Sequence, residues 1–466
     1  MKTKYLFIAV SAILMLNSCI AKSKYERPKD VVDENLFRTD RIPKDSLSIA
    51  NVSWKEIFTD TDLQNLISKS LENNLDIRIA LQNIASAEAY LKQSKTAYFP
   101  TLSVGPNYSY ATPSLNSVSG QSLDSRTSVN QYDITANLNW EIDLWGKLKS
   151  QEKSQLALYL GSVAAHQSVK SNLVASVATA YYQLLELDEE KKIISETIDI
   201  RNKNLETTKA LKEAGTVTEV AVQQSEALVY NAQASLISIN NQISQLENAI
   251  SLLMGESAHN IQRGTLDSQN ANISPDLGFP AMLLENRPDV RQAEMNLVNA
   301  FELTNFAKTQ FYPSLRITGS GGLQSVDIDN LFSGNSLFAN IVAGLTQPIF
   351  NGRQIRSNYE ASLAAKETAY LNFRKTVLIA GNEVSDALKI FTTQDQFISL
   401  KEKELKAYDN SVNFSQELVN YGMATYLEVL NADVSRLNAE LNIANAKFTK
   451  LQAAVELYRA LGGGWR

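Results

Sequence analysis

The chain has 466 residues, a formal net charge of −6 and a single cysteine. This acidic balance argues against nucleic-acid binding, which requires a basic surface. One cysteine excludes an internal disulfide, so an exported chain must be stable without one. After the first 18 residues no run of 18 or more apolar residues occurs, so the sequence predicts no transmembrane helix.

Residues 1–18 have the pattern of an export signal. Lys2 and Lys4 precede an apolar run that is too short for a spanning helix, and their removal would take the charge from −6 to −8. The small residue Ser18 stands directly before Cys19. This order resembles the bacterial lipobox and implies cleavage before Cys19 and lipid attachment to its thiol. The alternative is an ordinary secretory signal with a chance cysteine.

The most informative pattern is a duplication of nearly the whole chain. Residues 71–78 return as 284–291, at an offset of 213 (284 minus 71). The same order continues in three further pairs, which are 98–102 with 311–315, 144–147 with 349–353, and 215–218 with 422–425. This period is far longer than the roughly 20–50 residues of solenoid repeats. We therefore expect two copies of one half-protein, each with the order helix, hairpin, helix.

Long stretches with few glycines and prolines predict long helices. No proline occurs between Arg353 and Tyr421, which corresponds to about 100 Å of unbroken helix. Steps of seven from Tyr370 to Val419 meet an apolar residue every time. Steps of three and four do the same through Val229, Ala232, Leu236, Ile239, Ile243, Leu246, Ile250 and Leu253, and through Leu427, Leu430, Val434, Leu437, Leu441, Ala444, Phe448, Leu451, Val455 and Tyr458. This spacing is typical of coiled-coil packing.

Two segments break the helical period. Between Tyr132 and Trp140 apolar and polar residues alternate, which predicts a strand whose two faces meet different media. Residues 102–110 suggest its partner strand, and the Ser/Gly/Asn-rich residues 112–130 suggest the loop between them. The second half repeats the plan with strands predicted at 315–323 and 338–350, around a loop at 327–335.

The two hairpins would supply four strands of roughly 9–11 residues, long enough to cross a bilayer with tilt. Four strands cannot close a barrel, because open edges are not tolerated in lipid and known barrels begin at about eight strands. The chain is therefore expected to oligomerise, with eight strands in a dimer or twelve in a trimer. The alternative is a small soluble sheet.

Residues 280–294 resemble the signature of the TolC-type outer-membrane efflux channels, and most closely that of their lipoprotein (OprM/NodT-like) branch. The matching positions are Arg287, Pro288, Asp289, Arg291 and Glu294, followed by Phe311-Tyr312-Pro313-Ser314-Leu315 at the end of the helix. Tyr25-Glu26-Arg27-Pro28, Trp54, Phe58 and Leu63 also fit that branch. The likeness covers the chain from Cys19 to about Trp465.

The resemblance implies an α+β membrane protein built from a duplicated helix–β-hairpin–helix. It implies a homotrimer with a twelve-stranded outer-membrane β-barrel, four strands per chain, that continues into a long periplasmic α-helical barrel. Such a protein is lipid-anchored in the outer membrane, extends into the periplasm and contacts outer-membrane lipid. Its implied function is a passive exit duct for small molecules such as drugs, joined by a periplasmic adaptor (membrane fusion protein) to an inner-membrane pump of the resistance–nodulation–division type.

Two other functions remain open at this point: a periplasmic coiled-coil scaffold lipoprotein, or a type I protein-secretion exit channel. The expected division of the chain is a signal peptide at 1–18, a lipid-anchored and equatorial segment at 19–60, a first repeat at 61–255 with its hairpin at about 101–145, an inter-repeat equatorial segment at 256–280, a second repeat at 281–461 with its hairpin at about 314–351, and a tail at 462–466.

The turns at Gly215 and Gly422 match the periplasmic tips of this family, which form the closed gate and meet the adaptor. Thr218 and Thr425 are expected to cap the helices that follow, as any helical hairpin requires. The family's tip arginine falls on Ala424 here, so the resemblance implies no salt-bridge lock at that place.

Glu428 and Asn431 fall in the family's acidic iris segment, where Asn431 replaces a second acid. Three copies of Glu428 around a threefold axis would form a negative ring that favours cations. The alternative is a capping box, Thr425-x-x-Glu428, which would satisfy the first amides of the helix.

Tyr108, Tyr110, Tyr132 and Trp140 are candidates for an interfacial aromatic belt. Aromatic packing in the equatorial region or between subunits is the alternative, above all for Trp145. We predict that the chain is not an enzyme and binds no cofactor. The two histidines, His166 and His259, lack metal-ligand spacing, and neither a phosphate loop nor a nucleophile–base arrangement is present.

Overall fold

The computed structural model describes residues 23–32, 36–37, 49–117, 125, 127–270 and 282–466. Cys19 lies outside these residues. The chain forms two compact units, and each is described by itself. Within the described residues, no helix is both long enough and apolar enough to span a membrane.

The sheet unit consists of Ala85–Gly161, Glu294–Asn372 and the described residues up to Arg27, and the helical unit consists of Pro28–Ile84, Ser162–Ala293 and Phe373–Arg466. Each unit therefore combines segments from both copies of the repeat. The two copies do not fold as separate bodies.

The helices confirm the duplication, because each long helix has a partner of identical length. The pairs are α4 (Leu75–Thr96) with α8 (Pro288–Thr309), 22 residues each, α5 (Lys147–Glu213) with α9 (Gln354–Asn420), 67 residues each, and α6 (Glu219–Leu253) with α10 (Tyr426–Ala460), 35 residues each. The shorter helices are α2 (Trp54–Ile57), α3 (Thr61–Asn73) and α7 (Leu283–Asn286), with 3-10 turns at Lys29–Val31, Ile49–Asn51 and Leu266–Ser268.

The offset between the copies changes at one place only. It is 213 residues at the start of α4 and α8 (288 minus 75), and 207 at the start of α5 and α9 (354 minus 147) and of α6 and α10 (426 minus 219). The difference of six residues therefore falls between these points, in the hairpins. The helices themselves have kept their lengths.

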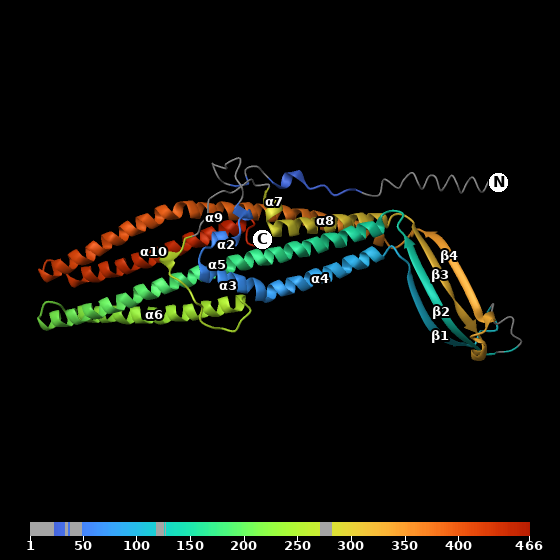
Figure 1. Cartoon of the computed structure of the whole chain (residues 1–466), viewed down its shortest axis with the longest axis horizontal. Coiled ribbons are helices and arrows are strands. Elements are labelled where there is room, and N and C mark those ends of the chain that lie inside the picture. Colours follow the sequence, from blue (N-terminus) through green and yellow to red (C-terminus); the bar gives the residue numbers. More distant parts are fainter. Residues whose placement is uncertain (1–22, 33–35, 38–48, 118–124, 126, 271–281) are drawn as a thin grey trace. The chain divides into compact units, whose positions relative to one another are not determined.

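The sheet contains four antiparallel strands in chain order, β1 (Thr101–Ala111), β2 (Val129–Ile142), β3 (Ser314–Ser325) and β4 (Leu337–Thr346) (Figure 1). Both predicted hairpins are confirmed. Short 3-10 turns at Ile328–Asn330 and Gly334–Ser336 lie between β3 and β4. The pairing of β2 with β3 joins the hairpins of the two copies into one sheet.

β4 ends at Thr346, whereas the sequence pattern predicted a strand as far as Phe350. Pro348 follows directly after Gln347 and has no N–H to donate to a ladder. The prediction of the strand end was therefore wrong by four residues. Gly352 and Arg353 then take positive φ angles of 60° and 68° before α9 begins.

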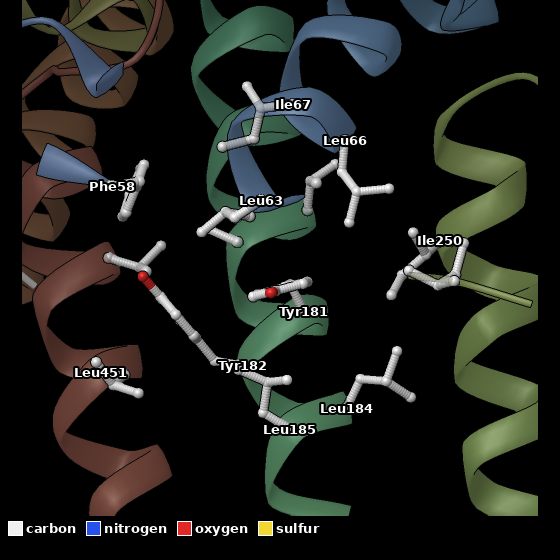
Figure 2. Close-up of a cluster of buried hydrophobic side chains, with 14 of the residues drawn as sticks. Phe58, Leu63, Leu66, Ile67, Tyr181, Tyr182, Leu184, Leu185, Ile250 and Leu451 are labelled. Carbon is white, nitrogen blue, oxygen red and sulfur yellow. The ribbon is translucent and has the colours of Figure 1, made fainter. Parts of the chain in front are cut away.

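The helical unit has a continuous hydrophobic core between α3, α5, α6 and α10. Figure 2 shows Tyr181 and Tyr182 of α5 among Leu63 of α3 and Leu451 of α10, with Phe58 beside them. The ring of Phe58 packs edge-to-face on Tyr182, with centroids 6.5 Å apart. These side chains hold the long helices against the short segments around residues 54–67.

The heptad seams point inward, as predicted. All positions from Tyr370 to Val419 at steps of seven are buried or half-buried, and so are the seam positions of α6 and α10 except Leu427, which is 51 % exposed. Leu427 lies in the first turn of α10, where the helix emerges from a loop. The spacing of apolar residues therefore identified the packed faces correctly.

Gly322 of β3 leaves no room for a side chain beside β2. A Cβ atom at Gly322 would overlap the backbone oxygen of Ile134. Its Cα partners are Thr135 in β2 and Phe338 in β4. Because the obstructing atom belongs to the backbone, no side-chain rotation can make room.

We expect Gly322→Ala to weaken the β2–β3 pairing at a cost of about 1–3 kcal/mol, the usual penalty for overpacking. Heat-modifiable migration on SDS gels, which reports the assembled sheet, measures this loss. Gly344→Ala is the matched control, because a Cβ at Gly344 in β4 meets nothing within 4 Å. Equal stability of the two variants would contradict the steric argument.

Candidate functional site

The strand register gives the sheet two chemically different faces, because directly opposed residues of antiparallel strands share a face. One face carries apolar side chains and glycines, namely Leu102, Val104, Pro106, Tyr108, Ile134, Ala136, Leu138, Trp140, Leu315, Ile317, Gly319, Gly321, Leu323, Leu337, Ala339, Ile341, Ala343 and Leu345. The other face carries mainly polar residues, including Ser103, Asn107, Asp133, Thr135, Asn137, Asn139, Glu141, Arg316, Thr318, Ser320, Gln324 and Asn340, with Phe338 and Val342 as apolar exceptions.

The apolar face is open to its surroundings. Leu102, Leu337 and Ile341 are 69 %, 73 % and 79 % exposed. A water-soluble antiparallel sheet normally covers its apolar face with other elements. An exposed apolar surface of this extent marks contact with a membrane or another protein.

The sheet also has two open edges. Among the described residues, β1 and β4 are each hydrogen-bonded to one neighbouring strand and have no partner on the other side. Unpaired backbone groups are costly in hydrocarbon, where only helices and closed barrels satisfy them. The apolar face and the open edges together require further strands from outside this chain.

The candidate belt residues lie near both ends of the sheet. Tyr108 and Tyr132 are opposed in β1 and β2, with ring centroids 5.1 Å apart, and the Tyr110 hydroxyl donates to Ser128 Oγ at 2.8 Å. At the other end, Trp140 Nε1 donates to the carbonyl oxygen of Tyr98 at 2.8 Å. The eight residue steps from Tyr132 to Trp140 correspond to roughly 26 Å along β2.

Trp145 packs inside the sheet unit. Its Nε1 donates to the Pro313 carbonyl oxygen at 2.7 Å, and its ring stacks on Tyr312 with centroids 5.1 Å apart. These contacts join the ends of the two hairpins.

Gly215 and Gly422 end α5 and α9 with φ angles of 75° and 67°. After each glycine, the next amide bonds to a carbonyl five residues earlier: Thr216 to Leu211 at 2.9 Å and Met423 to Leu418 at 2.8 Å. This is the Schellman arrangement, and a side chain at the glycine position would be strained. The sequence therefore located both turns correctly.

Thr218 and Thr425 occupy the N-cap positions of α6 and α10 with extended backbones, but neither side chain makes a capping hydrogen bond. Both threonines therefore stand at the expected N-cap positions, but their hydroxyls form no cap. The physical reason is that the amides of Ala221 and Glu428 already bond to the carbonyl oxygens of these two threonines, each at 3.1 Å.

Glu428 and Asn431 are exposed in the first turns of α10. Within the described residues, the Glu428 carboxylate has neither a hydrogen-bond nor an ion-pair partner in this single chain. The capping box Thr425-x-x-Glu428 is therefore not formed. Glu428 is free to face solvent or other copies of the chain.

The two tips differ in chemistry. The first tip is bridged by an ion pair between Lys212 and Glu219, both about half exposed. The equivalent residues of the second tip, 207 positions later, are Val419 and Tyr426. Tyr426 is buried and packs in one cluster with Val429 and Leu430, against Val217 and Ala221 of the first tip. The tips therefore contact each other through an apolar cluster.

A buried ion pair joins the helices behind the tips. Arg201 Nε of α5 lies 3.0 Å from Asp433 Oδ2 of α10, and both side chains are 4 % exposed. Arg201 Nη1 also donates to the carbonyl oxygen of Leu228 in α6 at 3.0 Å. Sequence analysis missed this pair. The available signal was an acid at Asp433, next to the seam position Val434.

Arg287 of the family signature forms a structural clamp. Its guanidinium, 4 % exposed, donates to Asp289 Oδ2 and Glu383 Oε2, both at 2.6 Å, and to the Ala460 carbonyl oxygen at 3.0 Å. Burial opposes the charge, yet the two carboxylates keep the pKa of Arg287 raised, and Arg287 in turn keeps the pKa of Asp289 lowered. The clamp joins the start of α8 to α9 and to the end of α10.

The other signature residues have separate roles. Pro288 is the first residue of α8, where a missing N–H costs nothing. Arg291 Nη1 donates to Gln167 Oε1 at 3.4 Å. Glu294 lies in the sheet unit and binds Arg27. Within the described residues, no group of three or more His, Cys, Asp and Glu side chains is placed to hold a metal ion.

The comparisons with known proteins agree with this geometry. The sequence profile of the outer membrane efflux protein family matches residues 66–256 and 279–463. The chain belongs to this family. It is an outer-membrane efflux channel.

Relatives of this efflux channel match over nearly their whole lengths. It is 29 % identical to the solvent efflux pump outer membrane protein SrpC of Pseudomonas putida, over 99 % of each chain. It is 24 % identical to SilC of Salmonella typhimurium, named as a probable outer membrane lipoprotein, again over 99 % of each chain. The solved structure of the outer-membrane channel OprN has the same fold, with a TM-score of 0.85 and 22 % identity over 95 % of this chain and 99 % of OprN.

We expect Asp433→Asn to destabilise the helical unit by about 3–5 kcal/mol, because it leaves the buried Arg201 guanidinium without its counter-charge. The melting temperature of the detergent-solubilised protein, followed by circular dichroism, measures the effect. Asp409→Asn is the control, since Asp409 is half exposed and 4.0 Å from Arg436, so its ion pair contributes under about 1 kcal/mol. Similar melting of both variants would show that the buried pair does not stabilise the helices.

Proposed function

We propose that this chain forms the exit duct of a tripartite efflux pump as a homotrimer. The observation that carries the proposal is the four-stranded sheet with one exposed apolar face and two unpaired edges. In a trimer, β4 of one copy would pair with β1 of the next, giving twelve strands and no edge. The apolar faces would then meet lipid, and the polar faces would line a water-filled lumen.

The long paired helices support a periplasmic tunnel below this barrel. Their seams bury one side of each helix, while the remaining faces carry small and polar side chains that tolerate water. The tips at Gly215 and Gly422 would form the gate and the contact with a periplasmic adaptor. We propose an inner-membrane pump of the resistance–nodulation–division type as the source of energy.

Small organic molecules are the proposed cargo, in line with the solvent that the name of SrpC specifies. A passive duct selects by pore width and charge, and it needs no binding site shaped for one compound. Export of unfolded proteins, as in type I secretion, is the second candidate. Drug and solvent susceptibility of a deletion strain separates these two cargo classes.

Cys19 is the proposed lipid attachment site. The name of SilC supports a lipoprotein, and the chain carries no other thiol. Residues 20–60 and 256–280, with the tail after 461, are the proposed equatorial belt. Tyr108, Tyr110 and Tyr132 are proposed as one aromatic girdle at a membrane surface, and Trp140 as part of the other.

The apolar face allows a sharp test of the membrane assignment. Ile341 lies at the middle of β4, and we expect Ile341→Arg to cost about 2–4 kcal/mol if this face meets the bilayer midplane. The yield of heat-modifiable trimer in outer-membrane fractions should fall accordingly. In a soluble scaffold, the same substitution at this exposed position would be tolerated.

Asn340→Arg is the matched control, because Asn340 is the adjacent, exposed residue on the polar face. It should assemble normally and shift the ion selectivity of the pore. If both variants assemble like wild type, the sheet does not cross the membrane, and the scaffold function is favoured.

The Glu428 ring is tested in planar bilayers. We expect Glu428→Gln to lower the ratio of cation to anion permeability, because three carboxylates leave the narrowest part of the pore. The reversal potential in a salt gradient measures this ratio. Glu88→Gln is the control, because Glu88 on α4 is also exposed and lies far along the sequence from both tips. This substitution removes the same charge. An unchanged reversal potential for Glu428→Gln would eliminate the ring.

A further inference from the structure

The signature acid Glu294 is buried, with 4 % of the residue exposed, and it binds residues from the start of the described chain. Arg27 Nε donates to Glu294 Oε1 and Arg27 Nη2 donates to Oε2, both at 2.7 Å. The Tyr25 hydroxyl also donates to Oε1, at 3.3 Å. A two-pronged guanidinium–carboxylate pair of this kind is among the strongest polar contacts in proteins.

The contact continues along α8 toward the sheet. The ring of Tyr25 packs edge-to-face on Phe301, with centroids 5.7 Å apart. Ser23 Oγ donates to Asn305 Oδ1 at 3.1 Å, and Asn305 Nδ2 donates to the Ser23 carbonyl oxygen at 3.2 Å. Residues seven and four positions apart share one face of a helix, so Glu294, Phe301 and Asn305 form a single stripe.

The segment Ser23–Arg27 lies extended on this stripe. Ser23, Tyr25 and Arg27 contact α8, and of these only Tyr25 is half-buried. Contacts at every second residue are the pattern of an extended chain. The four residue steps from Ser23 to Arg27 span roughly 13 Å, and the stripe from Glu294 to Asn305 spans roughly 16 Å. The side chains of the segment reach across the small difference, so the two lengths match.

The direction of the segment determines where the anchor lies. The segment runs antiparallel to α8, because Arg27 contacts Glu294 whereas Ser23 contacts Asn305, further along the helix. From Arg27 back to Ser23, the chain therefore runs toward Thr309, where α8 ends shortly before β3 begins. Cys19 is four residues before Ser23 and can lie at most about 14 Å from it. The attached lipid is thereby kept at the helix-to-strand junction, near the membrane end of α8.

We propose that Glu294, Phe301 and Asn305 form a receptor for Ser23–Arg27 that fixes the lipid anchor at the membrane-proximal end of α8. The inference rests on the proposed lipidation of Cys19 and adds the residues that position it. The partners depend on each other, because Glu294 without Arg27 would be a buried, unpaired carboxylate. The fixed tether would keep the lipid beside the start of the strands, so that membrane insertion of one raises the effective concentration of the other.

Trypsin provides the test on the full-length protein in membranes. Lys24 is exposed, and its peptide bond to Tyr25 can be cut only when the segment leaves α8, whereas the Arg27–Pro28 bond resists trypsin. Mass spectrometry scores release by the new N-terminus at Tyr25, because trypsin can also cut after Lys22 and Lys29. We expect Glu294→Gln to accelerate release roughly tenfold or more, because the uncharged amide loses the charge-assisted pair with Arg27.

Glu186→Gln is the matched control, since Glu186 is also a buried glutamate, 6 % exposed, and its partner is Asn445 rather than the tether. It should leave the release rate unchanged. The double variant Arg27→Glu/Glu294→Arg should restore slow release if the pair itself holds the segment. Equal release from wild type and Glu294→Gln would overturn the receptor.

Labelling with radioactive palmitate separates this inference from the lipoprotein proposal. Wild type and Glu294→Gln should take up equal label, and Cys19→Ala should take up none. Equal labelling with equal trypsin release refutes the receptor but leaves the lipid anchor intact. Absence of label in wild type refutes the lipid anchor and, with it, the proposed role of the receptor.

Discussion

The structure depends on one constraint, which is that the hydrogen-bonding edges of β1 and β4 must be paired before the sheet can reside in lipid. The apolar face makes water an unfavourable environment, and the open edges make lipid equally unfavourable for a single chain. Only association with further copies satisfies both. Duplication within the chain and association between chains therefore solve the same problem at two levels, because each adds strands without adding a new kind of hairpin.

Much of this architecture could be predicted from the sequence because it follows from periodicity. Alternation between Tyr132 and Trp140 identified a strand, and seven-residue steps from Tyr370 identified the packed face of α9. The pairing of β2 with β3 could not be predicted this way, since it depends on two hairpins about 200 residues apart. The Arg201–Asp433 pair was missed for the same reason, because its two residues are also far apart in the sequence. The Thr425 hydroxyl forms no cap because the Glu428 amide donates to the backbone carbonyl oxygen of Thr425 instead.

The family signature becomes understandable once its contacts are known. Arg287 and Asp289 belong to the helical unit, where they close the end of α10, whereas Glu294 belongs to the sheet unit, where it receives Arg27. Five residues of one helix thus separate two different structural roles. This short motif is therefore restrained from two sides, and the charges of Arg287 and Glu294 are neutralised by ion pairs although both residues are buried.

The equal lengths of α5 and α9, and of α6 and α10, have a consequence for symmetry. In a threefold assembly the six helical turns would form a ring. Their backbones would follow sixfold symmetry, whereas their side chains would follow only threefold symmetry. Lys212–Glu219 turns would alternate around the ring with Val419–Tyr426 turns. A partner that binds this ring would meet two chemically different turns in strict alternation, so identical copies of the partner would occupy two kinds of site.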